Sequence, residues 1–217
     1  AADYSVYALD LPGHGASSKE VGDGSVSMLS DSVLAFMDAL DLGAAHLVGH
    51  SLGGAVVLSV CDKARDRVRS LGLIAPAGLG EKADGDSLTN FVNADRRKSM
   101  KAALAALFGD ESFVNRDMIE SSLRYKRLDG VPEALTKISA GAFAGGKQVT
   151  IFADKVASFD VPMLAIWGED DAILSPDDAS VVEGVATVVK LPGVAHMPHM
   201  QAASEVNAAL KTHLSGA

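Results

Sequence analysis

The segment around Ser51 constrains the fold of this chain more than any other. Residues 49–54 read Gly-His-Ser-Leu-Gly-Gly, which contains a Gly-x-Ser-x-Gly pattern centred on Ser51. This pattern is typical of a strand that ends in a tight, strained turn and passes at once into a helix. We expect Gly49 and Gly53 to let the two backbones approach without a Cβ clash, and the helix N-terminus to place free N–H groups beside the Ser51 hydroxyl.

Apolar residues flank this turn on both sides. Leu47 and Val48 precede it and are typical of a buried strand, whereas residues 55–61 are almost all apolar and are typical of a buried helix. Strand, tight turn and helix in that order are what a nucleophile elbow requires. The context favours this interpretation over a glycine-rich turn in which the serine is a bystander.

Apolar periodicity predicts that strands and helices alternate along the first third of the chain. The predicted elements are a strand over residues 5–9, a helix over 28–40 capped by Ser25 or Ser27 and stopped by Gly43, the strand and helix around Ser51, and a strand over 68–74. This βαβαβ order predicts a mostly parallel sheet with helices on both faces.

Strand signals stop between residues 79 and 158. That segment has helical periodicity, with breaks near Gly109, Gly130 and Gly145. Strands are predicted again over 161–167 and 187–191, and helices over 177–185 and 202–214. The chain is therefore predicted to have three parts: a first core segment at 1–78, an inserted helical cap at 79–158, and a second core segment at 159–217.

The composition limits the kinds of molecule that we expect the chain to bind. The 217 residues carry a formal net charge of −9, which argues against nucleic acid or an anionic membrane, because both select basic surfaces. No apolar run approaches the roughly 18 residues of a membrane span. The single Cys61 excludes an intramolecular disulfide, so we expect a reducing compartment, the cytoplasm. The histidines and carboxylates lack metal-ligand spacing such as His-Glu-x-x-His, and we expect neither a metal nor a cofactor.

Acidic residues and a histidine follow the two strands predicted after residue 158. Residues 168–171 read Gly-Glu-Asp-Asp, and residues 192–196 read Pro-Gly-Val-Ala-His. The carboxyl ends of parallel strands meet at one edge of a sheet, so both loops can reach Ser51. A serine hydroxyl needs a base to take its proton and a carboxylate to orient that base. The chain supplies these groups in the order Ser, Asp, His.

The sequence resembles the α/β-hydrolase superfamily over nearly its whole length. The matching landmarks are Asp10-x-x-Gly13-x-Gly15-x-Ser17, Gly49-His50-Ser51-Leu52-Gly53-Gly54, Trp167-Gly168-x-x-Asp171 and Leu191-Pro192-Gly193-x-x-His196. Within the superfamily it is most similar to the hydrolase-like domain of the dihydrolipoyl acyltransferase-type component of bacterial acetoin dehydrogenase complexes. The residues that carry this likeness are Ala75-Pro76-Ala77-Gly78-Leu79-Gly80-Glu81, Val114-Asn115-Arg116 and Tyr125-Lys126-Arg127-Leu128-Asp129-Gly130.

The resemblance implies a role for each matching residue. Ser51 would be the nucleophile, His196 the general base and Asp171 the acid that orients it, with the Leu52 N–H as one oxyanion donor. Asp170 is the alternative to Asp171, which the spacing from Gly168 favours.

Other histidines are assigned less direct roles. His199 is the alternative to His196, but we expect it at the start of the following helix. We expect His14 to shape the wall of the site and His50 to pack beside the nucleophile.

The start of the chain departs from the family pattern. Family members open with two antiparallel strands and a central strand whose His-Gly turn supplies a second oxyanion N–H, and this sequence begins after that segment. We expect residues upstream of Ala1, or another chain, to fill the gap beside the strand that precedes Ser51. Smaller departures are Ala195 in place of glycine, Pro176 one position later than usual, and Gln201 in place of glutamate.

These observations predict a serine-dependent hydrolase of a small acyl or carbonyl compound, an ester or a thioester, with a link to acetoin catabolism. One alternative is a hydrolase of C–C bonds in ring-cleavage products, which shares every landmark. Another is a non-catalytic module of a multienzyme complex. The partners we expect are a small-molecule substrate and either a second copy of the chain or the other components of a multienzyme complex.

Overall fold

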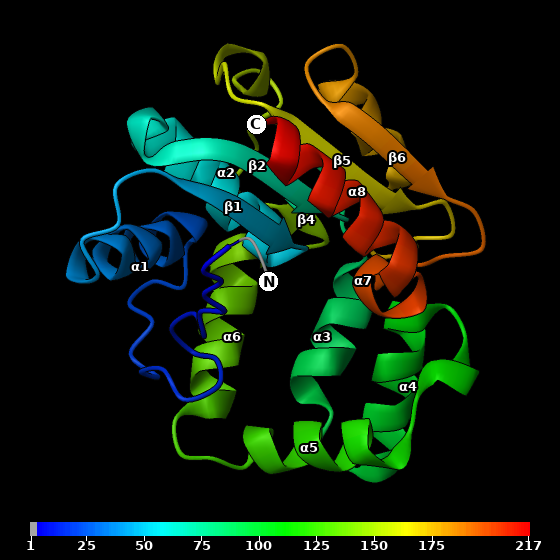
Figure 1. Cartoon of the computed structure of the whole chain (residues 1–217). Coiled ribbons are helices and arrows are strands. Elements are labelled where there is room, and N and C mark those ends of the chain that lie inside the picture. The colour runs from blue at the N-terminus through cyan, green and yellow to red at the C-terminus, as the bar shows by residue number, and fades with distance from the viewer. Residues whose placement is uncertain (1–3) are drawn as a thin grey trace.

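The computed structural model describes residues 4–217. Its centre is a four-stranded parallel sheet with the strand order β1-β2-β5-β6 (Figure 1). The strands are β1 (Ala45–His50), β2 (Val68–Ile74), β5 (Met163–Gly168) and β6 (Thr187–Leu191). The sequence predicted β2 and β6 to the residue, and it placed the start of β5 two residues too early.

Helices cover both faces of this sheet, as predicted. Alternate residues of β5 point to opposite sides: Ala165 and Trp167 pack into the main core, and Leu164 and Ile166 pack into a second cluster that contains Val206. The main core includes α2 (Leu52–Lys63), and the second cluster lies under α8 (Ala203–Gly216), which crosses the front of the sheet in Figure 1.

Helix α1 (Val26–Ala39) packs against α2 and begins two residues before the predicted start, after Ser25, one of the two predicted caps. The Ser25 hydroxyl accepts a hydrogen bond from the Met28 N–H at 3.1 Å, which caps the helix. The predicted stop at Gly43 is wrong, because the helix ends at Ala39 and the chain reverses at Asp41 with φ 50°.

The predicted strand over residues 5–9 does not form. These residues are described but adopt no strand, and Val6 and Tyr7 remain 69% and 54% exposed. Strand β1, which has Val48 44% exposed, lies at an edge of the sheet. Apolar alternation indicates a strand only when a neighbouring strand can satisfy its backbone groups, and residues 5–9 have none among the described residues.

Four α-helices lie between β2 and β5 and occupy the lower half of Figure 1. They are α3 (Gly85–Asn93), α4 (Arg97–Phe108), α5 (Arg116–Lys126) and α6 (Val131–Ala142). The helical character of this segment is as expected, while its delimitation as a cap over 79–158 stays a prediction. Strand signals do not stop completely: β3 (Phe143–Ala144) and β4 (Lys147–Gln148) form a short antiparallel hairpin around Gly145 and Gly146, both with positive φ.

The remaining elements are short. They are the 3₁₀ helices η1 (Arg65–Arg67), η2 (Glu111–Phe113), η3 (Val156–Ser158) and η4 (Pro176–Val182), and the single turn α7 (Pro198–Gln201). The helix expected over 177–185 is therefore a 3₁₀ helix, and it ends two residues before Gly184, where φ is 92°. None of the helices within residues 4–217 is both long and apolar enough to cross a membrane.

Candidate active site

Ser51 lies in the tight turn between β1 and α2. Its backbone has φ 52° and ψ −120°, a conformation that is strained for a residue with a side chain. Two backbone hydrogen bonds hold it there: the Ser51 N–H donates to the Ile74 carbonyl at 3.1 Å, and the Ala77 N–H donates to the Ser51 carbonyl at 2.9 Å. The end of β2 and the loop after it thus fix the strained turn.

The steric need for glycine in this turn differs from the expectation. A Cβ at Gly49 would lie closer than 3.0 Å to the backbone of Gly53 and Gly54, and one at Gly54 would lie 2.5 Å from the Pro76 Cβ. A Cβ at Gly53 would meet no atom within 4 Å. The steric argument therefore holds for Gly49 and is wrong for Gly53, where the close approach belongs to its neighbour Gly54.

This difference gives a paired test of the turn. Gly49→Ala is expected to lower the free energy of unfolding by about 2–3 kcal/mol, because the new methyl group would overlap backbone that cannot move aside. Gly53→Ala is expected to raise it by about 0.5–1 kcal/mol, because it removes a glycine from the α2 helix without a clash. Urea unfolding of both variants measures the effect, and equal behaviour of the two would contradict this account of the turn.

His196 lies in the loop after β6 and reaches the Ser51 hydroxyl. Its Nε2 lies 2.9 Å from the Ser51 Oγ, and its Nδ1 lies 2.8 Å from the Asp171 Oδ2. The His196 residue is only 3% exposed. A carboxylate can only accept, so Nδ1 carries the hydrogen and Nε2 is left to accept from the serine hydroxyl.

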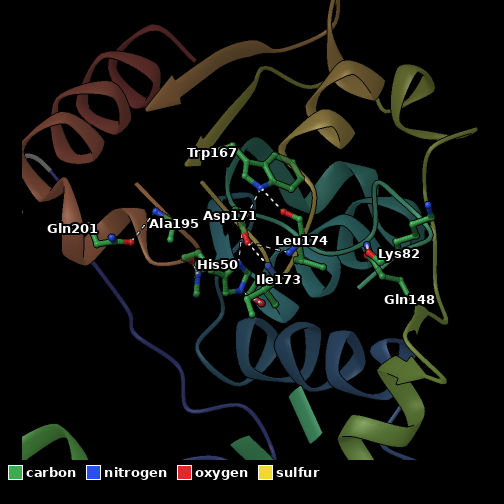
Figure 2. Close-up of polar contacts among 11 residues, drawn as sticks. His50, Lys82, Gln148, Trp167, Asp171, Ile173, Leu174, Ala195 and Gln201 are labelled. Atoms are coloured by element: carbon green, nitrogen blue, oxygen red, sulfur yellow. Dashed lines mark hydrogen bonds and ion pairs between the residues drawn. The ribbon is translucent and has the colours of Figure 1, made fainter. Parts of the chain in front are cut away.

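The Asp171 carboxylate accepts hydrogen bonds on both oxygens. Oδ1 accepts from the Ile173 and Leu174 N–H groups at 2.8 and 3.0 Å, and Oδ2 accepts from the Trp167 indole at 3.0 Å as well as from His196 (Figure 2). Because Asp171 is only 6% exposed, these donors replace the water that a buried carboxylate loses. The loop after β5 therefore holds the carboxylate in a fixed position beside the imidazole.

The alternative acid and base lie elsewhere. Asp170 is exposed, and its backbone N–H donates to the Val194 carbonyl at 2.9 Å. His199 lies on α7, as expected, with its ring centroid 4.5 Å from that of His50. Among the described residues, neither side chain has a hydrogen bond to Ser51 or His196.

His50 does more than pack beside the nucleophile. Its Nε2–H donates to the His196 carbonyl at 2.7 Å, and the two ring centroids are 5.0 Å apart. Burial lowers the pKa of His50 to about 3, so the ring is neutral at physiological pH. The sequence places His50 directly before Ser51, but only the tertiary structure shows that His50 holds the loop of His196.

The Leu52 N–H is a free donor at the start of α2. No acceptor within residues 4–217 takes a hydrogen bond from it. A free N–H at a helix N-terminus, directly after Ser51, can stabilise negative charge that develops near the Ser51 hydroxyl.

The turn around His14 packs against the helices that follow β2. The His14 Nδ1 lies 3.2 Å from the Pro12 carbonyl, and the Tyr125 hydroxyl of α5 donates to the Gly13 carbonyl. A Cβ at Gly13, where φ is 85°, would overlap the Ile138 side chain of α6. These contacts do not involve Ser51, His196 or Asp171, so a role of His14 in the wall of the site stays a prediction. No group of three or more His, Cys, Asp or Glu side chains in the described part of the chain is arranged to hold a metal ion.

Curated relatives match almost the whole chain. It is 44% identical over 207 residues, 95% of its length, to the dihydrolipoyllysine-residue acetyltransferase component of the acetoin cleaving system of Pseudomonas putida. It is 39% identical over 213 residues, 98% of its length, to the component of the same name of Cupriavidus necator. The chain spans only 55% and 57% of these two relatives.

A second group of similar proteins carries another name. The chain is 29% identical over 184 residues, 81% of its length and 63% of the relative, to a 2-hydroxy-6-oxononadienedioate/2-hydroxy-6-oxononatrienedioate hydrolase of Burkholderia vietnamiensis. Among solved structures, the 2-hydroxy-6-oxo-6-phenylhexa-2,4-dienoate hydrolase of Rhodococcus superimposes with a TM-score of 0.82 at 20% identity, over 94% of this chain and 78% of that one. This structural likeness concerns the fold alone.

The model of one protein family matches residues 1–203, and its description is the alpha/beta hydrolase fold. This match covers most of the chain, and the parallel sheet with helices on both faces agrees with it. The chain therefore belongs to the α/β-hydrolase fold family.

Proposed function

We propose that the chain is a serine-dependent hydrolase of a small acyl or carbonyl compound. The observation that carries the proposal is the hydrogen-bonded series from Ser51 Oγ through the His196 imidazole to the Asp171 carboxylate, with separations of 2.9 and 2.8 Å. Such a series makes a serine hydroxyl nucleophilic at neutral pH.

In the proposed reaction, Ser51 Oγ attacks the substrate carbonyl while its proton passes to His196 Nε2. Asp171 stabilises the resulting imidazolium, and the Leu52 N–H donates to the oxyanion. The His196 proton then goes to the leaving group as its bond to carbon breaks, which leaves an acyl group on Ser51. Water then loses a proton to His196 and adds to the acyl carbon. The bond from that carbon to Ser51 Oγ breaks, Oγ takes the proton back from His196, and the acid leaves.

Esters and thioesters are the proposed substrate class. The name of the relatives at 39% and 44% identity refers to acetyl transfer in an acetoin cleaving system, which supports a small acyl group and association with a multienzyme complex. We propose the cytoplasm as the location, because the single Cys61 is buried and forms no disulfide. Cleavage of a C–C bond in a ring-cleavage product is the second candidate, which the likeness to the Burkholderia vietnamiensis hydrolase favours.

A fluorophosphonate probe tests whether Ser51 is an activated nucleophile. We expect the probe to label Ser51 in the parent protein, and Ser51→Ala to lose both the label and the turnover of p-nitrophenyl acetate. Ser112→Ala is a matched control, because Ser112 is exposed and its hydroxyl donates only to Asp110. An unlabelled Ser51 in the folded parent protein would favour the non-catalytic module.

A substrate panel separates the two enzymatic candidates. We expect turnover of short acyl esters and acyl thioesters, with a burst of the first product if the acyl group on Ser51 is hydrolysed slowly. Turnover of a vinylogous diketone, without turnover of either acyl substrate, would instead support C–C bond hydrolysis.

A further inference from the structure

The Gln201 side chain joins two parts of the molecule that are distant in sequence. Gln201 ends α7, and its Oε1 accepts a hydrogen bond from the Ala195 N–H at 3.1 Å (Figure 2). Its Nε2 donates to the Phe108 carbonyl at 3.0 Å. One amide therefore connects the residue before His196 to the last residue of α4.

A second hydrogen bond runs between the same two segments. The His196 N–H donates to the Leu107 carbonyl of α4 at 3.1 Å. The last carbonyls of a helix have no partner within it and carry the negative end of its dipole, so they favour donors. Gly109, with φ 63°, caps α4 directly after Phe108, and a Cβ there would lie 3.1 Å from the Ala195 Cβ. The end of α4 and the His196 loop are thus in close contact.

We infer that Gln201 is a positioning residue, which holds the His196 imidazole in line with Ser51 by fixing its loop to the end of α4. The inference rests on the function proposed above. In this chain the side chain at position 201 accepts one hydrogen bond and donates another, and a glutamine amide does both. An ionised glutamate would accept from the Ala195 N–H but would face the Phe108 carbonyl with a second acceptor.

The inference explains why the amide matters although it touches neither Ser51 nor the imidazole. His196 is held from three sides, because His50 binds its carbonyl, Leu107 binds its N–H and Asp171 binds its ring. Gln201 binds the N–H of Ala195, the residue before His196, and the carbonyl of Phe108, the residue after Leu107. Loss of one of these links lets the imidazole shift without leaving the site, which affects the chemical step more than substrate binding.

The Gln201→Glu variant tests this role through its pH profile. A protonated glutamic acid accepts and donates as glutamine does, whereas the carboxylate only accepts. Partial burial beside a carbonyl is expected to raise the pKa of this glutamate above its ordinary value of about 4.3. We expect kcat at pH 8 to fall about 10- to 100-fold, the cost of a small misplacement of a catalytic group, with KM nearly unchanged. As the pH falls through that pKa, kcat should return towards the parent value.

Gln201→Met is the matched control, because it keeps the length of the side chain but neither accepts nor donates strongly. We expect it to lower kcat without adding a limb to the pH profile. Circular dichroism and thermal unfolding establish that both variants fold. A folded Gln201→Glu enzyme with the pH profile and kcat of the parent protein overturns the inference.

Amide hydrogen exchange separates this inference from the proposed function. We expect the Ala195 N–H to be protected in the parent protein and to exchange faster in the Gln201→Met variant, whether or not the protein is catalytic. If the Ala195 N–H exchanges faster in the Gln201→Met variant but no probe labels Ser51 in the parent protein, the proposed function is contradicted and the link to α4 is supported. Unchanged exchange would remove the link itself.

Discussion

The His196→Ala protein is expected to hydrolyse its substrate about 10⁶-fold more slowly than the parent protein. The imidazole is the only side chain hydrogen-bonded to the Ser51 hydroxyl among the described residues, and without it the proton of the attacking hydroxyl has no acceptor in place. Residual turnover would come from substrate binding and from the Leu52 N–H alone. The measurement is kcat for a p-nitrophenyl ester, with fluorophosphonate labelling of Ser51 as a second readout.

His199→Ala is the control for this experiment, because the sequence offers His199 as the alternative base. His199 packs against His50 and has no hydrogen bond to Ser51 within the described chain. We expect its replacement to change kcat by less than about 10-fold, through loss of packing beside His50. A large loss in His199→Ala together with an active His196→Ala protein would exchange the two assignments.

The fold followed from the sequence wherever local pattern and tertiary context agree. β2 is a largely buried strand between β1 and β5, β6 is an edge strand paired with β5, and both appear over the residues predicted. The segment at 5–9 is also apolar, but it lacks a neighbouring strand in the described structure and forms no strand. Pairing is a property of two segments, and the sequence of one does not settle it.

The three main residues of the candidate site could be predicted from the sequence. The residues that hold them in position could not. Ser51 is marked by its turn, while Asp171 and His196 are marked by the strands that precede them. His50 and Gln201 carry no such mark, because their roles depend on which backbone groups lie opposite them. The one sequence signal for Gln201 is an amide at a position where the expected family pattern has glutamate.

The Asp171→Asn protein is expected to lose about 10⁴-fold in kcat. Both oxygens of the carboxylate accept from N–H groups, so an asparagine NH₂ must face donors in either orientation. If it faces His196, Nδ1 must act as the acceptor and the hydrogen moves to Nε2, which then cannot take the serine proton. If it faces the Ile173 and Leu174 N–H groups, the loop that positions the side chain is displaced. Steady-state kinetics, with thermal unfolding to show that the protein folds, measures the loss.

Asp170→Asn is the matched control one residue earlier. Asp170 is exposed, and its backbone N–H donates to the Val194 carbonyl, which the substitution leaves unchanged. We expect kcat within about 2-fold of the parent value, as for other surface substitutions. The two carboxylates are adjacent in sequence. The loop after β5 turns Asp171 inward, where it binds the Trp167 indole and the His196 imidazole, and leaves Asp170 at the surface. A loss of activity in Asp170→Asn, with Asp171→Asn still active, would therefore show that this loop adopts another conformation when the protein works.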